Sequence, residues 1–244
     1  MNILVLMGAP RSEKDKIMED LREIKRTTIF EHSYNTLKGI DNAHFIFVVK
    51  KEDVIRWHID NIIKLLEPGA DVIVTNGDTK GAACTAMLAV DRINNVNPLV
   101  IAGGNQIVME PLQKVVSDFF GRKLDAGTIV FRDIHPRWSY VKINEDTGYV
   151  TEAAEKKPIS MNASTGFYYY SHGEDFVRAV KKMILKDTNV NGIYYLSLCL
   201  NELILEQKEV GVYRIPKDRY YNLNHKEGIE AFEKYLERQE ERGI

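Results

Sequence analysis

Cysteines and long apolar runs are both scarce in this chain of 244 residues. Its two cysteines, Cys84 and Cys199, stand inside apolar runs of helical character. We therefore predict reduced core residues, not a disulfide framework or a metal site. No apolar run approaches the roughly 18–20 residues that a membrane-spanning helix needs. The apolar start, residues 1–7, lacks a basic region and a cleavage signal, which indicates a first strand and a cytoplasmic protein without a membrane partner.

Strong charge of one sign is also missing. The formal net charge of -2 argues against a surface built for nucleic acid, although a local basic patch and a nucleic-acid acceptor stay open as alternatives. The 6 histidines are scattered without the spacing of metal ligands. No phosphate-binding P-loop, dinucleotide fingerprint or Ser-His-Asp order is visible, and Gly103-Gly104 lacks the spacing of a dinucleotide motif.

Short apolar runs alternate with helical periods through the first half of the chain. The continuous apolar runs are typical of parallel strands that helices cover on both faces. This alternation predicts an α/β fold. The predicted strands are 3–7, 44–49, 71–75, 99–102 and 128–131, and the predicted helices are 28–37, 52–66, 81–93 and 111–120.

The pattern changes after residue 132. We predict a hairpin of 139–143 and 149–153, strands at 165–170 and 210–215, and helices at 174–185, 194–206 and 226–242. No linker divides the chain, so we expect a single domain over 1–244, with one half at 1–132 and another at 133–244 that extends the same sheet. The last helix alternates in charge, which is typical of a solvent-exposed helix and makes it a candidate contact of a homodimer.

Five segments, taken in order, resemble the sugar-1-phosphate nucleotidyltransferases and related proteins of GT-A type. Their order and spacing carry the resemblance over most of the chain, and no single one of them is decisive. The segments are Met7-Gly8-Ala9-Pro10-Arg11, residues 27–33, residues 79–85, residues 99–106, and Glu155-Lys156-Lys157-Pro158 with Asn162, Thr165 and Gly166. The resemblance implies a Rossmann-like GT-A fold with a mixed, mostly parallel central sheet and helices on both faces. It also implies a nucleotide-binding half at 1–132 and a sugar- or acceptor-binding half at 133–244.

The nucleotide side rests on small residues at strand ends. A strand followed by Gly8-Ala9 lets backbone N–H groups approach a base or phosphate, and Arg11 can pair with phosphate oxygens. For this loop, the alternative interpretation is an ordinary turn with a solvated arginine. For the small residues from Gly81 on, the alternative is a helix that packs tightly on the sheet. The resemblance implies catalytic roles for Arg11 and Lys157. It implies nucleotide contacts for Met7, Gly8, Ala9, Arg11, Thr79, Gly81, Ala82 and Gly104.

This chain departs from the family's pattern at the first loop. The glycine-rich stretch is short, and residues 19–22 stand where the family has a Lys-Pro pair that helps to neutralise the triphosphate. The basic residues that could substitute for that lysine are Lys14, Lys16, Arg22, Lys25 and Arg26.

The chain also differs from the family's pattern at the metal-side positions, whereas the sugar-side positions match it. The resemblance places Asn105 and Asn189 where the family has metal-side residues, and Mg²⁺ or Mn²⁺ as the cofactor. A neutral amide is a weaker ligand for such a hard cation than a carboxylate is, and helix capping is the alternative role of Asn189. The resemblance implies sugar contacts for Glu155, Lys156, Asn162, Thr165 and Gly166, where a solvated turn is the alternative.

The resemblance and the departures from it imply three candidate functions. The first is a nucleotidyltransferase that joins a nucleoside triphosphate, CTP or UTP, to a sugar-1-phosphate or a similar phosphomonoester and releases pyrophosphate. The second is a GT-A glycosyltransferase that uses a nucleotide-sugar, with the loop 135–138 facing the acceptor. The third is a non-catalytic nucleotide-binding relative.

Overall fold

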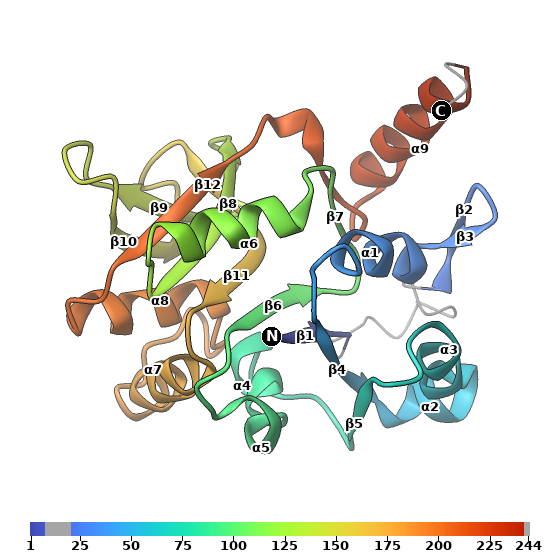
Figure 1. Ribbon diagram of the computed structural model, residues 1–244, viewed down its shortest axis with the longest axis horizontal. Coiled ribbons are helices and arrows are strands. Elements are labelled where there is room, and N and C mark those ends of the chain that lie inside the picture. Colours follow the sequence, from blue (N-terminus) through green and yellow to red (C-terminus); the bar gives the residue numbers. More distant parts are fainter. Residues whose placement is uncertain (8–20, 242–244) are drawn as a thin grey trace.

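The computed structural model describes residues 1–7 and 21–241 (Figure 1). Its strands are β1 (Asn2–Leu6), β2 (Glu23–Ile24), β3 (Thr27–Thr28), β4 (His44–Lys50), β5 (Asp71–Thr75), β6 (Leu99–Gly103), β7 (Gln106–Val108), β8 (Ala126–Arg132), β9 (Ser139–Ile143), β10 (Val150–Glu155), β11 (Asn162–Tyr170), β12 (Val210–Arg214) and β13 (Tyr220–Asn222). Its helices are α1 (Ile29–Leu37), α2 (Lys51–Trp57), α3 (Ile59–Leu66), α4 (Ala82–Met87), α5 (Val90–Ile93), α6 (Leu112–Gly121), α7 (Gly173–Leu185), α8 (Leu196–Leu205), the 3-10 helix η2 (Lys217–Arg219) and α9 (Lys226–Glu241).

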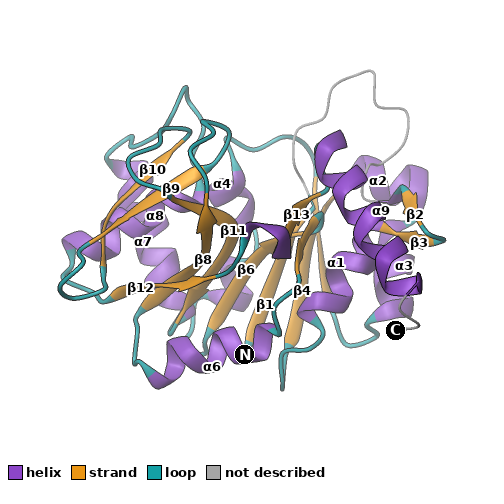
Figure 2. Ribbon diagram, turned by 90° about the horizontal axis from the view of Figure 1, so that it is seen from above, coloured by secondary structure: helices purple, strands orange, loops and turns teal. Residues whose placement is uncertain are grey.

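A nine-stranded sheet runs through both halves of the chain. Its main path has the order β10-β9-β11-β6-β1-β4-β5, and β8 joins it by pairing with β11 and β12. β1 lies parallel to β4 and β6, whereas β11 is antiparallel to β6, β8 and β9. Figure 2 shows β8, β11, β6, β1 and β4 side by side across the middle of the molecule. The fold is therefore α/β with a mixed, mostly parallel sheet, in which β10 and β11 oppose the other strands.

Helices cover both faces of this sheet (Figure 1). Successive side chains of a strand point to opposite faces. Accordingly Ile3 and Val5 join one core cluster, which also takes side chains from α1, α3 and α6. Leu4, between them, joins a second cluster with side chains from α4, α5, α7 and α8. This two-sided burial explains why the first strands show as continuous apolar runs in the sequence, and it confirms the predicted fold class.

The predicted helix over 52–66 is wrong as a single helix. His58 adopts the left-handed conformation, with φ 50° and ψ 41°, and so ends α2 and starts α3. The break turns α3 so that Ile59 and Ile63 are fully buried against the sheet. The predicted helix over 81–93 is likewise divided into α4 and α5. The predicted core role of the cysteines is confirmed for Cys199, which is buried, and Cys84 is half-buried; both are free thiols.

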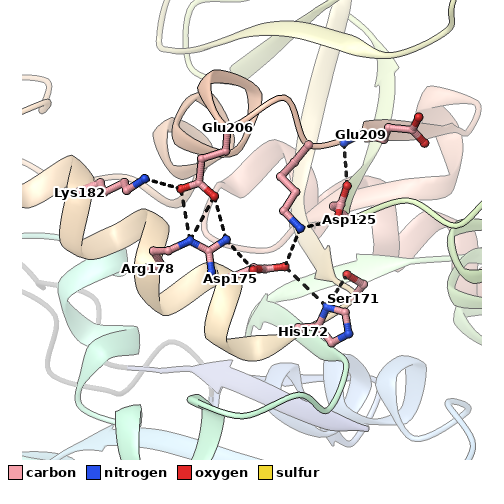
Figure 3. Close-up of polar contacts among 9 residues, drawn as sticks. Asp125, Ser171, His172, Asp175, Arg178, Lys182, Glu206 and Glu209 are labelled. Carbon is pink, nitrogen blue, oxygen red and sulfur yellow. Dashed lines mark hydrogen bonds and ion pairs between the residues drawn. The ribbon is translucent and has the colours of Figure 1, made fainter.

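Ionic side chains gather at the edge of the sheet where β8 begins and β11 ends (Figure 3). Arg178 bridges the buried Asp175 at 2.6 Å and Glu206 at 2.8 Å. Lys182 reaches the same glutamate at 2.7 Å, and Lys208 contacts Asp125 at 2.9 Å. Because Asp125, Asp175 and Glu206 each have a cationic partner, this network ties α7 to the chain around α8 and β8.

Among the described residues, no helix combines the length and the apolar character needed to cross a bilayer.

Candidate functional site

A cavity of about 580 Å³, hereafter the main cavity, opens where β1 and β6 end. In open α/β sheets this edge is the usual place for ligands. The described lining residues come from both halves of the chain and are Leu6, Thr79, Gly81, Ala82, Thr85, Ala102, Gly103, Asn105, Gln106, Ser139, Glu155, Gly166, Tyr168, Ile193, Tyr195, Leu196, Ser197 and Asn224. The structure therefore brings together six residues that the sequence nominated: Thr79, Gly81, Ala82, Asn105, Glu155 and Gly166.

One wall is the turn that leads into α4. Gly81 has φ +117°, and a Cβ atom there would lie 2.8 Å from the backbone nitrogen of Tyr194. Only glycine fits this conformation and this approach. The Thr79 hydroxyl lies 2.6 Å from that of Thr85 and donates to the Gly81 carbonyl at 3.1 Å. These contacts hold a smooth wall of small residues whose shape suits a flat ring.

The floor is formed by the end of β6 and the start of β7. Gly104 packs against Met7, because a Cβ atom there would lie 2.8 Å from Met7 Cγ. Both residues are buried, and neither is among the described residues that line the cavity. Gln106 lines the cavity beside Gly166, where a Cβ atom would come within 2.6 Å of the glutamine amide nitrogen. Gly166, with φ +86°, thus makes room for Gln106, a residue that the sequence analysis missed.

Asn105 meets a second asparagine that the sequence analysis also missed. Its Nδ2 donates to Oδ1 of Asn224 at 2.6 Å, across a separation of 119 residues in sequence. Asn189 lies elsewhere: its Oδ1 accepts from the Gly192 backbone and its Nδ2 donates to Asp187. The structure therefore pairs Asn105 with Asn224, and gives Asn189 a turn-stabilising contact instead.

The donor set at this asparagine pair suits Mg²⁺ or Mn²⁺ poorly. These hard cations take near-octahedral oxygen sets in which carboxylates usually contribute charge. The pair offers neutral amide oxygens, and one of them already accepts a hydrogen bond. No group of three or more His, Cys, Asp or Glu side chains with metal-binding geometry occurs in residues 1–7 and 21–241.

Glu155 forms another part of the lining, at the end of β10. Ser197 donates to its Oε2 at 2.8 Å, and Ser139 and Tyr168 line the cavity beside it. Burial raises the pKa of Glu155, and the hydrogen bond from Ser197 and the nearby Lys156 offset part of that effect. A desolvated carboxylate among hydroxyls gains most from ligand groups that donate hydrogen bonds.

Lys156 is held at the rim. Its ammonium donates to the Tyr195 hydroxyl at 3.0 Å and lies 5.2 Å from the centre of that ring. The hydrogen bond to Tyr195 raises the pKa of Lys156. Lys157 is exposed and does not line the cavity. Of the two lysines in this segment, only Lys156 contacts a cavity wall.

Two of the predicted sugar-side residues lie behind the wall. Asn162 donates to the carbonyl of Val141 at 3.4 Å, and the buried Thr165 accepts a hydrogen bond from Tyr220 on its carbonyl at 2.8 Å. Neither lines the cavity. Gly8, Ala9 and Arg11, together with Lys14 and Lys16, lie outside the described residues.

The main cavity is nearly free of charge in the part of the chain that the structure describes. Glu155 is the single ionisable acid among those lining residues, and no lysine or arginine is among them. Lys156 stands at the rim, 3.0 Å from the lining Tyr195. The described walls are therefore built for a ring and for polar groups more than for a polyphosphate.

Comparisons with known proteins identify the fold. The chain superposes on a nucleoside-diphosphate-sugar pyrophosphorylase from Vibrio cholerae RC9 with a TM-score of 0.78, 19% identity, and coverage of 95% of this chain and 99% of that one. A Bacillus anthracis protein, a candidate glucose-1-phosphate thymidylyltransferase crystallised with sucrose, gives a TM-score of 0.72, 18% identity, and coverage of 94% and 92%. None of the protein-family models and none of the curated sequences compared matches the chain. At this identity the likeness is one of fold: the chain shares the α/β fold of these two proteins.

Proposed function

We propose that this protein is a nucleotidyltransferase that joins a nucleoside triphosphate to a sugar-1-phosphate or a similar phosphomonoester and releases pyrophosphate. The observation that carries the proposal is the main cavity, whose lining combines small residues that suit a ring with a carboxylate and hydroxyls that suit the hydroxyl groups of a sugar. Both similar structures bear names of enzymes that make nucleotide-sugars, which supports the same reaction class. CTP and UTP are the proposed nucleotides.

The proposed reaction needs positioning more than acid–base chemistry. The attacking phosphate oxygen is already ionised, so no general base is required, and catalysis rests on alignment and charge neutralisation. Thr79, Gly81 and Ala82 would hold the base. Glu155 would accept hydrogen bonds from the sugar hydroxyls, and the hydroxyls of its neighbours Ser139 and Ser197 would donate or accept further ones.

We assign charge neutralisation to basic residues, of which the structure describes Lys156 and Lys157. The proposed cationic contacts to phosphate are Lys156 at the rim and Arg11 of the first loop. Lys157 is the alternative to Lys156 for this contact. Because the asparagine pair suits a metal poorly, we expect Mg²⁺ or Mn²⁺ to arrive bound to the nucleotide, and no step here depends on a protein-held ion.

The direct test measures pyrophosphate release from each common nucleoside triphosphate, offered with a panel of sugar-1-phosphates and either Mg²⁺ or Mn²⁺. We expect release that needs both substrates and is fastest with CTP or UTP. Pyrophosphate that forms without a sugar phosphate, or no release from any pair, would contradict the proposal.

Three variants test the site itself. Asn105 and Asn224 both line the cavity, and we assign their amide N–H groups to hydrogen bonds with phosphate oxygens; we therefore expect kcat/KM to fall about a hundredfold in the double variant Asn105→Ala, Asn224→Ala. Glu155→Gln should raise KM for the sugar phosphate about tenfold, because a charged acceptor is lost. Asn189→Ala is the control, since that side chain bonds Asp187 and Gly192 outside the cavity. An Asn189 effect equal to that of the pair would overturn this assignment.

A second candidate is favoured by the same neutral asparagine pair. A protein that binds a ready-made nucleotide-sugar, as a glycosyltransferase or a non-catalytic relative, needs neither triphosphate neutralisation nor a strong metal site. Calorimetric titration with UDP- and CDP-sugars separates the two functions. Binding of these compounds by protein that releases no pyrophosphate would favour the second candidate.

A further inference from the structure

A second cavity, of about 560 Å³, lies beside the last helix and is hereafter the α9 cavity. α9 runs next to β13 and reaches away from the central sheet (Figure 1). The described lining comprises Phe131, Asp133, Arg137, Trp138, Lys217, Asp218, Tyr220, Tyr221, Asn222, His225, Glu227, Gly228, Ala231, Lys234, Tyr235 and Arg238. None of these residues lines the main cavity, and the function proposed above uses none of them.

Aromatic rings make up much of this lining. The Trp138 ring packs edge-on against Phe131, with 5.3 Å between ring centres, and lies 5.8 Å from Tyr220. Across the lining, Tyr221 and Tyr235 are 5.8 Å apart. These five rings around one opening provide a large, rigid surface on which a planar ligand can pack, because offset and edge-on ring pairs are both favourable.

Trp138 also carries a polar group without a partner. Its indole nitrogen is buried and has no hydrogen-bond acceptor among the described residues. A buried N–H group left unpaired costs free energy, so such groups in folded proteins usually have a partner, which can be a ligand. The indole therefore favours a ligand that brings a hydrogen-bond acceptor.

The cations of the lining fall into two classes. Lys217 pairs with Asp133 at 2.7 Å, and Arg137 approaches Glu227 at 3.7 Å. Lys234 and Arg238 have no ion pair within residues 1–7 and 21–241, although they stand one helical turn apart on α9 and line the same cavity. Two neighbouring cations without acidic partners favour an anion.

We propose that the α9 cavity is a binding site for a small aromatic anion. The planar ring of the ligand lies among Trp138, Tyr221 and Tyr235, its anionic group pairs with Lys234 and Arg238, and an acceptor atom takes the indole N–H of Trp138. The cavity volume lies within the range of small-molecule sites.

The indole group of Trp138 reports on the proposed ligand directly. The chain has only 2 tryptophans, so Trp57→Phe leaves one indole N–H resonance in a ¹⁵N-labelled protein and assigns it to Trp138. We would titrate the full-length wild type and this variant with 1-naphthyl phosphate. We expect a saturable downfield shift of the Trp138 resonance as the N–H gains an acceptor.

Two partial ligands show whether both features count. 1-Naphthol keeps the ring without the charge, and inorganic phosphate keeps the charge without the ring. Because each lacks one set of contacts, we expect both to bind about tenfold more weakly than 1-naphthyl phosphate. If 1-naphthol bound as tightly as 1-naphthyl phosphate, the cavity would bind the ring alone without recognising the charge, and the proposal would be overturned.

Charge reversal on α9 gives the decisive comparison. Lys234→Glu and Arg238→Glu, both at exposed helix positions, should each raise the Kd at least about tenfold. Lys226→Glu is the matched control on the same helix, because Lys226 does not line the cavity, and its Kd should stay within about twofold. The proposal is overturned if millimolar 1-naphthyl phosphate leaves the Trp138 resonance in place, or if all three variants bind alike.

Discussion

Two glutamates at different places around the sheet show how differently this molecule uses charge. Glu206, in the ionic network at the far edge, sits between Arg178 and Lys182, and the hydrogen bond from Arg178 first of all lowers its pKa to about 2. Glu155, in the main cavity, is held by a serine hydroxyl, and burial raises its pKa. In the network, cationic side chains of the protein occupy the carboxylate of Glu206. In the cavity, Glu155 keeps lone pairs that can accept hydrogen bonds from a ligand. Four predictions test this contrast.

The largest effect is expected at the glycine wall of the cavity. Gly81→Ala adds a Cβ atom against the backbone of Tyr194 at a positive φ, and should lower the free energy of unfolding by about 3 kcal/mol. Gly192→Ala is the control, because its φ is +76° but no atom lies within 4 Å of the added Cβ; its cost should be about 1 kcal/mol. Urea unfolding measures both. Equal losses would mean that the backbone contact at Gly81 does not constrain the wall.

The second prediction breaks the network. Arg178→Ala leaves the buried Asp175 and the half-buried Glu206 short of a partner. Because the Arg178 side chain is 39% exposed, we expect a loss of about 2 kcal/mol, below the full cost of breaking a buried pair. Lys182→Ala removes a more exposed cation and should cost under about 1 kcal/mol. Thermal unfolding at low and high salt tests the order of the two.

The third prediction concerns acid. Glu206 ionises at a lower pH in the folded state than in the unfolded chain, whose ordinary value is 4.5. Its contribution is therefore present above pH 4.5 and is lost as the pH falls toward about 2. In Arg178→Ala the fall in unfolding free energy over this window should be shallower than in wild type. Identical slopes in urea titrations from pH 5 to pH 2 would contradict the role of Arg178.

The smallest effect has the opposite sign. The pKa of Glu155 is raised, so its folded carboxyl is most favourable when protonated, and stability is lost as the pH rises through the folded pKa. Glu155→Gln should therefore raise the free energy of unfolding at pH 7 slightly, by under about 1 kcal/mol, while Glu206→Gln lowers it. If Glu155→Gln also destabilised the protein, the cavity carboxylate would be a structural ion like those of the network.

The sequence predicts some elements of the fold and not others, for physical reasons. Continuous apolar strands such as β4 and β6 are visible in sequence because both of their faces are buried. The break at His58 was not predictable, because a single residue in the left-handed conformation does not change the spacing of apolar residues along the sequence. The short strands β7 and β13, of three residues each, carry no pattern of their own.

The cavity followed the same logic. Thr79, Gly81, Ala82 and Glu155 stand beside strand ends or turns that the pattern marks, and they were found. Asn224 and Gln106 were missed because nothing local distinguishes them: Asn224 reaches Asn105 only through the pairing of β7 with β13, across 119 residues. Tertiary closure, and not local sequence, makes that half of the site.

The stretch from Asn222 to His225 acquires a further meaning from its position. Asn222 and His225 face the α9 cavity, Asn224 faces the main cavity, and the N–H of Leu223 bonds the carbonyl of Asn105 at 2.9 Å. These four consecutive residues thus lie between the main cavity and the α9 cavity and belong to the walls of both. If a ligand in one cavity shifts these residues and so changes the affinity of the other cavity, the second ligand changes the affinity of the first by the same free energy.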